Sequence, residues 1–135
     1  MLVATDIVLL GKDTFGGTSI LLIQRKNQPF QFAWALPGGF VDPDEDLADG
    51  AKRELAEETG IKIESLRHVG AYGKPYRDPR GRVISIAFTA NVSIEDFEPK
   101  AMDDAINIGW FSLDELPMLA FDHPEIIKDA MAIQC

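Results

Sequence analysis

The stretch of sequence that decides the fold is Gly39–Ile61, GFVDPDEDLADGAKRELAEETGI. Its first part, up to Asp46, mixes a glycine, a proline and several acids, as a loop does. Its second part is rich in residues that favour helices. We predict a helix over residues 46–59, because acids occupy its first turn and Gly60 directly follows its end. The stretch therefore indicates a loop that leads straight into a helix.

Three glutamates gather on one face of the predicted helix. At about 100° per residue, Glu57 and Glu58 lie on either side of Glu54, all within one sector of about 100°. The neighbouring stripe, which is suited to packing on a sheet, consists of Ala48, Ala51, Leu55 and Thr59. Like charges at these spacings weaken a helix unless a cation lies among them. Because Mg²⁺ and Mn²⁺ prefer carboxylate oxygens, the pattern predicts a divalent metal site.

Two further residues of the helix allow two interpretations each. Gly50 lies on the glutamate face, where it either lets a ligand or the backbone come close or allows tight packing against the turn at 37–39. Arg53 lies beside Glu57, where it either orients a catalytic carboxylate or forms an ordinary surface ion pair. The sequence alone leaves both questions open.

The composition of the whole chain narrows the class of protein. The chain has 135 residues, 46% hydrophobic and 26% charged, with a formal net charge of −9. This size predicts one domain over residues 1–135. The negative charge disfavours general binding to nucleic acid or to an anionic membrane, and no apolar run is long enough to cross a bilayer. The only cysteine, Cys135, excludes an internal disulfide, and we expect a cytoplasmic protein.

The charge is concentrated in two segments. Eight acids and two bases between Asp42 and Glu58 give that segment a net charge of −6, so the rest of the chain carries only −3. Between Lys74 and Arg82, four bases and one acid give +3. Both segments can be ordinary solvated surfaces. An acidic and a basic cluster in one small domain also suggest a site that holds metal ions and a phosphorylated ligand together.

Strand-like and helix-like segments alternate around the acidic helix. We expect a hairpin of residues 3–10 and 19–24, a strand, tight turn and strand over 34–41, further strands over 61–76, 82–92 and 106–111, and a last helix over 123–133. Ser112 and Asp122 each begin a pattern typical of a helix start, with an acid three residues later. This irregular order predicts one α/β unit.

The quoted stretch matches a family pattern at all nine of its defined positions. These are Gly39, Glu45, Arg53, Glu54, Leu55, Glu57, Glu58, Gly60 and Ile61. The chain therefore resembles the Nudix hydrolases, with the Nudix box over residues 39–61. The resemblance implies a Nudix-type α/β/α sandwich, with a mixed β-sheet between helices. It also implies Mg²⁺-dependent cleavage of a nucleoside diphosphate linked to another group, with Mn²⁺ as an alternative ion.

The resemblance assigns roles to individual residues. The metal-binding carboxylates of the family correspond to Glu54, Glu57 and Glu58. Arg53 corresponds to the orienting arginine of the catalytic group, Gly39 to the glycine at the mouth of the site, and Glu45 to a glutamate that holds loop and helix together. Glu57 is our first choice for the general base, and Asp104, in a later loop, is the alternative.

Segments outside the box narrow the substrate. Residues 76–82 and 120–123 are similar to those of the ADP-ribose pyrophosphatase branch of the family, which implies hydrolysis of ADP-ribose to AMP and ribose 5-phosphate. The candidates for binding the pyrophosphate or the terminal ribose are Arg25, Arg77, Arg80 and Arg82. The candidates for stacking on adenine are Phe30, Phe32 and Tyr76.

Two other functions stay open at this stage. The box specifies the chemistry and not the leaving group, so hydrolysis of oxidised nucleoside triphosphates such as 8-oxo-dGTP, of NADH or of nucleotide sugars competes with ADP-ribose. A domain that senses ADP-ribose without hydrolysing it is the second alternative, and the intact Glu54, Glu57 and Glu58 argue against it. The family likeness further suggests a homodimer whose partner is a small nucleotide and not a nucleic acid.

Overall fold

A computed structural model describes residues 1–134 of the chain, and Cys135, on which the disulfide argument rested, lies outside them. The elements are β1 (Leu2–Lys12), β2 (Thr18–Arg25), β3 (Trp34–Ala35), β4 (Gly38–Phe40), α1 (Leu47–Thr59), β5 (Arg67–Tyr72), β6 (Val83–Ser93), the 3₁₀ turn η1 (Ile94–Asp96), β7 (Ala105–Ser112) and α2 (His123–Ala132). Within residues 1–134, no helix is long and apolar enough to span a membrane.

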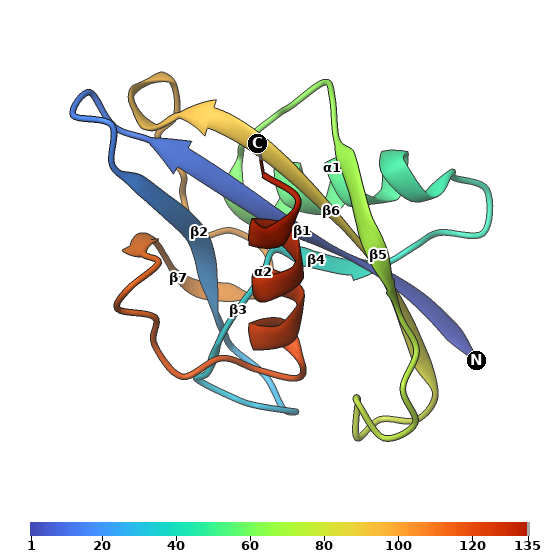
Figure 1. Ribbon diagram of the computed structural model, residues 1–135. Helices are drawn as coiled ribbons and strands as arrows, with labels where there is room; N and C mark the ends of the chain where they lie inside the picture. Colours follow the sequence, from blue (N-terminus) through green and yellow to red (C-terminus); the bar gives the residue numbers. More distant parts are fainter. Residues whose placement is uncertain (135) are drawn as a thin grey trace.

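A mixed seven-stranded sheet forms the middle of the molecule (Figure 1). Its central strand, β1, pairs in parallel with β6 along its whole length, from Leu2 opposite Val83 to Lys12 opposite Ser93. The other pairings are antiparallel: β1 with β2 and β4, β2 with β3 and β7, and β5 with β6. The predicted hairpin of β1 and β2 is confirmed.

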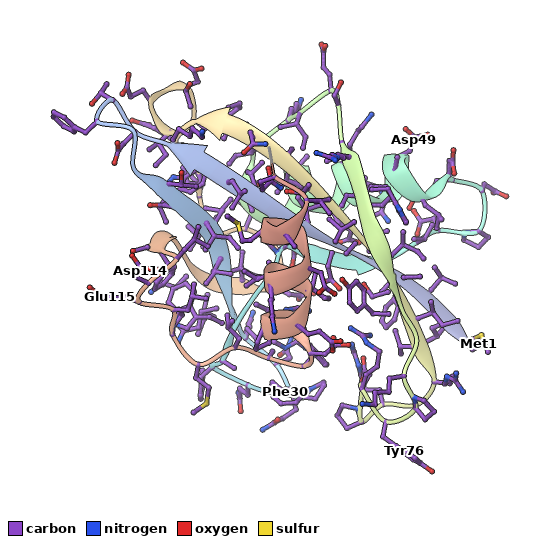
Figure 2. All side chains as sticks on the ribbon, in the orientation of Figure 1. Met1, Phe30, Asp49, Tyr76, Asp114 and Glu115 are labelled. Carbon is purple, nitrogen blue, oxygen red and sulfur yellow. The ribbon has the colours of Figure 1, made fainter. Side chains whose placement is uncertain are left out.

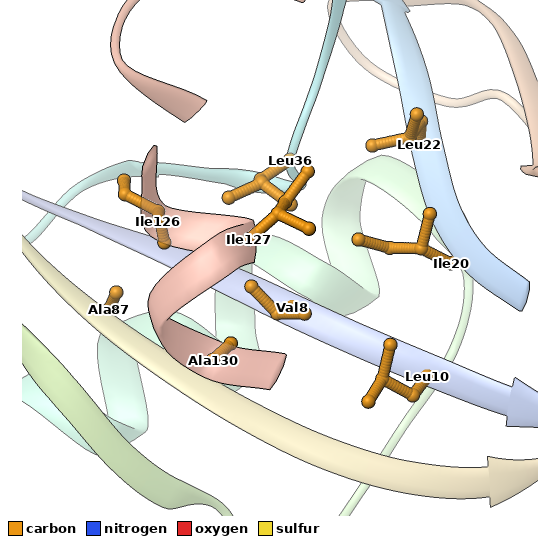
Figure 3. Packing of buried hydrophobic residues seen from close by; sticks show 9 residues of the cluster. All are labelled: Val8, Leu10, Ile20, Leu22, Leu36, Ala87, Ile126, Ile127 and Ala130. Carbon is orange, nitrogen blue, oxygen red and sulfur yellow. The ribbon is translucent and has the colours of Figure 1, made fainter. Parts of the chain in front are cut away.

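Helices cover both faces of this sheet. Because successive side chains of β1 point to opposite faces, this strand contacts both helices. On one face, Val8 and Leu10 pack with residues of α2, namely Ile126, Ile127 and Ala130 (Figure 3). On the other face, the β1 residues Ile7 and Leu9 pack with the α1 residues Ala51 and Leu55. The predicted α/β/α sandwich with a mixed sheet is therefore confirmed.

The strands part at the place where β2 leaves β1. Only the end of β1, from Leu10 to Lys12, pairs with β2, whereas Ala4–Asp6 pairs with β4. Between these two pairings, the backbone N–H of Ile7 donates to the Pro37 carbonyl at 2.9 Å. The segment after β3 thus replaces β2 beside the first half of β1, and a cavity opens between the end of β2 and β4.

The strand, turn and strand expected over 34–41 form as β3 and β4, which pair with β2 and β1 and not with each other. Three other local expectations were wrong. Of the strand expected over 61–76, only Arg67–Tyr72 forms, and Ile61 instead packs in the core with Ala51 and Leu55 of α1. Ser112 begins a turn, in which its hydroxyl accepts from the Asp114 N–H at 3.3 Å, and not a helix. Asp122 precedes α2 but does not cap it with its side chain, because both of its carboxylate oxygens accept hydrogen bonds from Arg77.

Candidate active site

The helix that carries the glutamates begins and ends where the sequence predicts. The Asp46 side chain accepts from the Leu47 N–H at 2.7 Å, and Gly60 ends α1 in the left-handed conformation, with φ of 78°. Ala51, Leu55 and Thr59 are buried against the sheet. This anchoring fixes the rotation of α1, so that Glu54 and Glu58 line the cavity.

The two glycines before the helix allow a very close approach of backbone and side chain. A Cβ on Gly38 would lie 1.9 Å from the Thr5 carbonyl oxygen, and a Cβ on Gly39 would lie 2.5 Å from the Glu54 carboxyl group. A Cβ on Gly50 would lie 3.0 Å from a carboxylate oxygen of Glu45, so Gly50 allows tight packing against the loop before α1. This differs from the packing on the 37–39 turn that the sequence had suggested.

The cavity has a volume of about 500 Å³ and collects charged groups of both signs. Its acids come from β1, α1 and the loops at 41–46, 73–82 and 97–104, and its cationic side chains come from β2, the following loop and the 73–82 loop. The acids are Asp6, Asp42, Glu54, Glu58, Asp78, Asp103 and Asp104, and the cations are Arg25, Lys26, Arg77 and Arg80. Two clusters that are separate in the sequence thus meet in one site.

The three predicted metal ligands lie in different surroundings. Glu58 is 6% exposed and accepts from the Gly38 N–H at 2.7 Å, and burial raises the pKa of its carboxyl group to about 8. Burial also raises the pKa of Glu54, against the opposing effect of Arg53. The Glu57 side chain is 46% exposed and is not among the residues that line the cavity. The structure therefore brings Glu54 and Glu58 together in the cavity, and the metal role of Glu57 stays a prediction.

Arg53 is the centre of a network of acids and does not form an isolated surface ion pair. Its guanidinium donates to Glu45 at 2.6 Å, to Glu54 at 3.0 Å and to Glu57 at 3.2 Å, and also to the Phe40 carbonyl at 3.1 Å. One planar group thus ties the loop before α1 to two glutamates of the helix. These contacts support the orienting role and the structural role of Glu45.

This network predicts a change in stability at acidic pH. Hydrogen bonds from Arg53 and from the Asp42 N–H lower the pKa of Glu45 to about 2 in the folded protein. The stability that the Glu45 carboxylate provides is therefore present above its unfolded pKa of about 4.3 and is lost as the pH falls toward 2. In thermal melts followed by circular dichroism, we expect the metal-free wild type to have a higher Tm than Glu45→Gln near pH 7. This difference in Tm should shrink below about pH 4. A difference that does not vary between pH 7 and 3 contradicts this assignment.

A loop before β7 adds two acids to the cavity. The Met102 N–H donates to the Glu58 carbonyl at 3.0 Å, and the Lys26 N–H donates to the Asp104 carbonyl at 3.2 Å. These bonds hold the loop between the end of α1 and the end of β2. Asp103 and Asp104 consequently line the cavity, as Asp104 must if it is the general base.

The predicted substrate-binding residues separate into those that line the cavity and those that do not. Arg25 and Arg80 line the cavity, and so does Arg77, but the Arg77 side chain is only 4% exposed and forms a bidentate ion pair with Asp122. Tyr76 is 96% exposed in a turn with φ of 67°, and Arg82 donates to the Gly73 carbonyl at 2.9 Å. Neither lines the cavity, so their contacts with substrate stay predictions (Figure 2 labels Tyr76).

Sequence reasoning missed a buried polar group in the same cavity. His123 Nε2 lies 3.4 Å from Asp6 Oδ1, and Asp6 also accepts from the Ser85 hydroxyl. The Leu36 N–H donates to His123 Nδ1 at 3.0 Å, which places the ring proton on Nε2, toward Asp6. Burial opposes ionisation of Asp6, but His123 and Ser85 together hold its pKa below the usual range. These residues are far apart in the chain, and no spacing rule connects them.

The carboxylate oxygens of the cavity are the kind of ligand that a hard divalent cation prefers. Within residues 1–134, no three His, Cys, Asp or Glu side chains stand close enough to hold a metal ion in their present arrangement. Glu54 and Glu58 nevertheless offer carboxylate oxygens in one cavity. Burial raises the pKa of both carboxyl groups, and the charge of Glu54 raises that of Glu58 further, a cost that a cation offsets. The residues therefore fit Mg²⁺ or Mn²⁺.

Comparisons with known proteins agree with this site. The protein named ADP-ribose pyrophosphatase of Methanocaldococcus jannaschii is 53% identical over 114 residues, which are 83% of this chain and 65% of that protein. The solved NUDIX domain of Shewanella oneidensis NrtR complexed with ADP ribose is 31% identical, with a TM-score of 0.88, over 98% of this chain and 87% of that one. The chain spans 53 to 65% of the length of three curated relatives that it matches.

A third similar protein holds a metal ion. It is a bifunctional NMN adenylyltransferase/ADP ribose pyrophosphatase from Francisella tularensis, solved in complex with AMP and a manganese ion. It is 32% identical to this chain, with a TM-score of 0.86, over 97% of this chain and 41% of that one. The family model described as the NUDIX domain matches residues 2–130. With its fold, its glutamate helix and this match together, the chain belongs to the NUDIX domain family.

Proposed function

We propose that this chain is a Mg²⁺-dependent pyrophosphohydrolase that cleaves ADP-ribose to AMP and ribose 5-phosphate. The observation that carries the proposal is the cavity itself, in which Glu54 and Glu58 share one space with Arg25 and Arg80. Acids of this kind hold divalent ions and arginines bind phosphate oxygens, so the cavity suits a pyrophosphate with its metal. The 53% identity to a protein named ADP-ribose pyrophosphatase supports the choice of substrate.

The residues of the chain would divide the work as follows. Glu54 and Glu58 would hold the metal, with Glu57 as the predicted third ligand. A bound divalent ion neutralises charge that develops on the phosphates and lowers the pKa of water. Arg53 keeps Glu54 in place through a hydrogen bond of 3.0 Å. Arg25 and Arg80 would bind and orient the pyrophosphate, which brings the reacting phosphorus to the acids.

The reaction consumes one water molecule and needs one general base. The water oxygen attacks a phosphorus of the pyrophosphate, and the bond from that phosphorus to the bridging oxygen breaks in line. The base accepts the proton that the water loses, and the leaving phosphate keeps the bridging oxygen. Asp104 lines the cavity, whereas Glu57 bonds to Arg53 outside its lining, so the structure makes Asp104 the better supported of the two predicted bases.

A panel of substrates tests the proposal. We expect the purified chain with Mg²⁺ to hydrolyse ADP-ribose with a kcat/KM at least about tenfold above that for NADH, ADP-glucose or 8-oxo-dGTP. The two arginines of the cavity suit a diphosphate with groups at both ends and so disfavour the triphosphate, and the 53% identity to a protein named ADP-ribose pyrophosphatase favours ADP-ribose over the other two diphosphates. Chromatography of the products measures the rates and identifies AMP. The same panel with Mn²⁺ tests the alternative ion.

The panel also separates the competing functions. A preference for 8-oxo-dGTP contradicts the substrate and keeps the enzyme class. Binding of ADP-ribose without turnover of any member supports a sensor, which the solved complex of a similar NUDIX domain with ADP ribose makes a concrete alternative. A homodimer, from the family likeness, and a cytoplasmic location, from the sequence, are further proposals, and light scattering on the purified chain tests the first of them.

A further inference from the structure

A second hollow adjoins the charged cavity and differs from it in chemistry. It is lined by Gln28, Pro29, Phe30, Pro79 and Arg80 and has a volume of about 550 Å³. Gln28 and Arg80 line the charged cavity as well, so the two hollows meet at these side chains. We call the second one the proline groove. Three of its five lining residues are apolar, and its only charged one is the shared arginine.

The aromatic wall of the proline groove is held in an unusual backbone conformation. Phe30 has φ of 56° and is 41% exposed. Its side chain is labelled in Figure 2. Its ring lies 4.8 Å from that of Phe121, which has φ of 52° and lines the charged cavity. Bulky residues adopt positive φ only at a cost, so two such aromatic residues in contact at the junction of two hollows point to a function for the exposed ring.

Arg80 lies at the junction of the two hollows, and Asp78 holds its side chain in position. Its guanidinium forms a bidentate ion pair with the buried Asp78, at 3.1 and 2.7 Å. The Arg80 Cζ atom also lies 5.6 Å from the ring centre of Phe121 and 5.0 Å from that of Phe40. A guanidinium can donate to a phosphate at its edge and stack on a flat ring with its face. Arg80 can therefore contact both parts of a ligand that extends from one hollow into the other.

We propose that the proline groove binds the nucleobase of the substrate. The proposal rests on the proposed function, which places the pyrophosphate in the charged cavity. A phosphate or a free sugar gains little from proline and phenylalanine walls, whereas a purine has two apolar faces and a polar edge. The Gln28 side chain, whose hydrogen bonds to Gln31 are both long at 3.5 Å, supplies an amide for that edge. Among the three aromatic candidates from the sequence, the proposal selects Phe30.

Titration calorimetry with two inert ligands tests the base subsite. The first ligand is α,β-methylene-ADP, whose bridge resists hydrolysis, and the second is methylenediphosphonate, which is the same bridge without the nucleoside. With Mg²⁺ present, Phe30→Leu is expected to weaken binding of the first ligand about tenfold and to leave the second within twofold of wild type. Phe30→Tyr keeps a ring at the position and should restore the affinity.

Phe32→Leu is the matched control. Phe32 also has positive φ, 69°, and is 59% exposed, but it lines neither hollow, so its loss should change neither affinity. The proposal is overturned if Phe30→Leu leaves binding of α,β-methylene-ADP unchanged, or if it weakens both ligands equally. Such a result with a wild type that still hydrolyses ADP-ribose leaves the proposed function intact. If the wild type hydrolyses no member of the panel, but Phe30→Leu weakens binding of α,β-methylene-ADP alone, the proposed function is contradicted and the base subsite is retained.

Discussion

Replacement of Glu58 by Gln, or of Glu54 by Gln, is expected to lower Mg²⁺-dependent hydrolysis of ADP-ribose by about 100-fold or more. Either change removes a negative charge and a metal-ligand oxygen from the cavity. Glu58→Gln keeps an oxygen that can accept from the Gly38 N–H, which lies 2.7 Å from the carboxylate, and it keeps the length of the side chain. The fold should therefore survive while the metal site is lost.

The metal-free proteins supply a second measurement for the same variants. Burial raises the pKa of Glu58 to about 8, so the native protein resists its ionisation, and a neutral amide there should not lower the Tm in EDTA. Mg²⁺ should raise the Tm of the wild type and have a weaker effect on both variants. Glu64→Gln is the control, because Glu64 is exposed and does not line the cavity. Wild-type turnover in Glu54→Gln and Glu58→Gln would refute the metal assignment.

The local parts of the site could be predicted from the sequence. The bounds of α1 depend on Asp46 before it and Gly60 after it, and both caps form within a few residues of the helix end. The face that Glu54 and Glu58 share follows from helical periodicity, and a stripe of small and apolar residues fixes which way it points. Each of these features is decided by neighbours in the chain, which is why a single sequence reveals them.

The basic segment shows where such prediction ends. Arg77 and Arg80 are three residues apart in the same turn, and nothing in their spacing tells them apart. Packing of α2 brings Asp122 to Arg77, 45 positions earlier in the chain, and this pairing buries Arg77. Arg80 is left at the mouth of the cavity with 41% of its side chain exposed. The choice between a structural and a binding arginine is thus made by tertiary contacts.

The same reason explains the missed pair of Asp6 and His123. Asp6 lies on β1 and His123 begins α2, so their contact exists only when the helix packs across the sheet. In the sequence, Asp6 interrupts an apolar strand and His123 precedes a proline. An ionisable residue within a strand that otherwise resembles a core strand is the one signal that could have indicated such a contact, because a buried carboxylate needs partners.

Removal of Arg53 is the second change with a large expected effect. Arg53→Ala should lower kcat/KM for ADP-ribose by about 10- to 100-fold and the Tm by about 3 to 8 °C. The variant leaves Glu45, Glu54 and Glu57 without the donor that joins them, and the like charges of α1 then repel. The side chain is 27% exposed, so solvent screens part of this loss and the fold should persist.

Two variants separate the geometry of Arg53 from its charge. Arg53→Lys keeps the charge, but one ammonium group cannot reproduce the fork that reaches three carboxylates and the Phe40 carbonyl, so it should restore most of the Tm and little of the turnover. Lys52→Ala removes a positive charge from the neighbouring position of α1 and should change neither quantity by much. Full activity in Arg53→Lys, or an equal loss in Lys52→Ala, would mean that Arg53 acts by charge alone. A selective loss of turnover in Arg53→Lys would instead make orientation of Glu54 its contribution to the reaction.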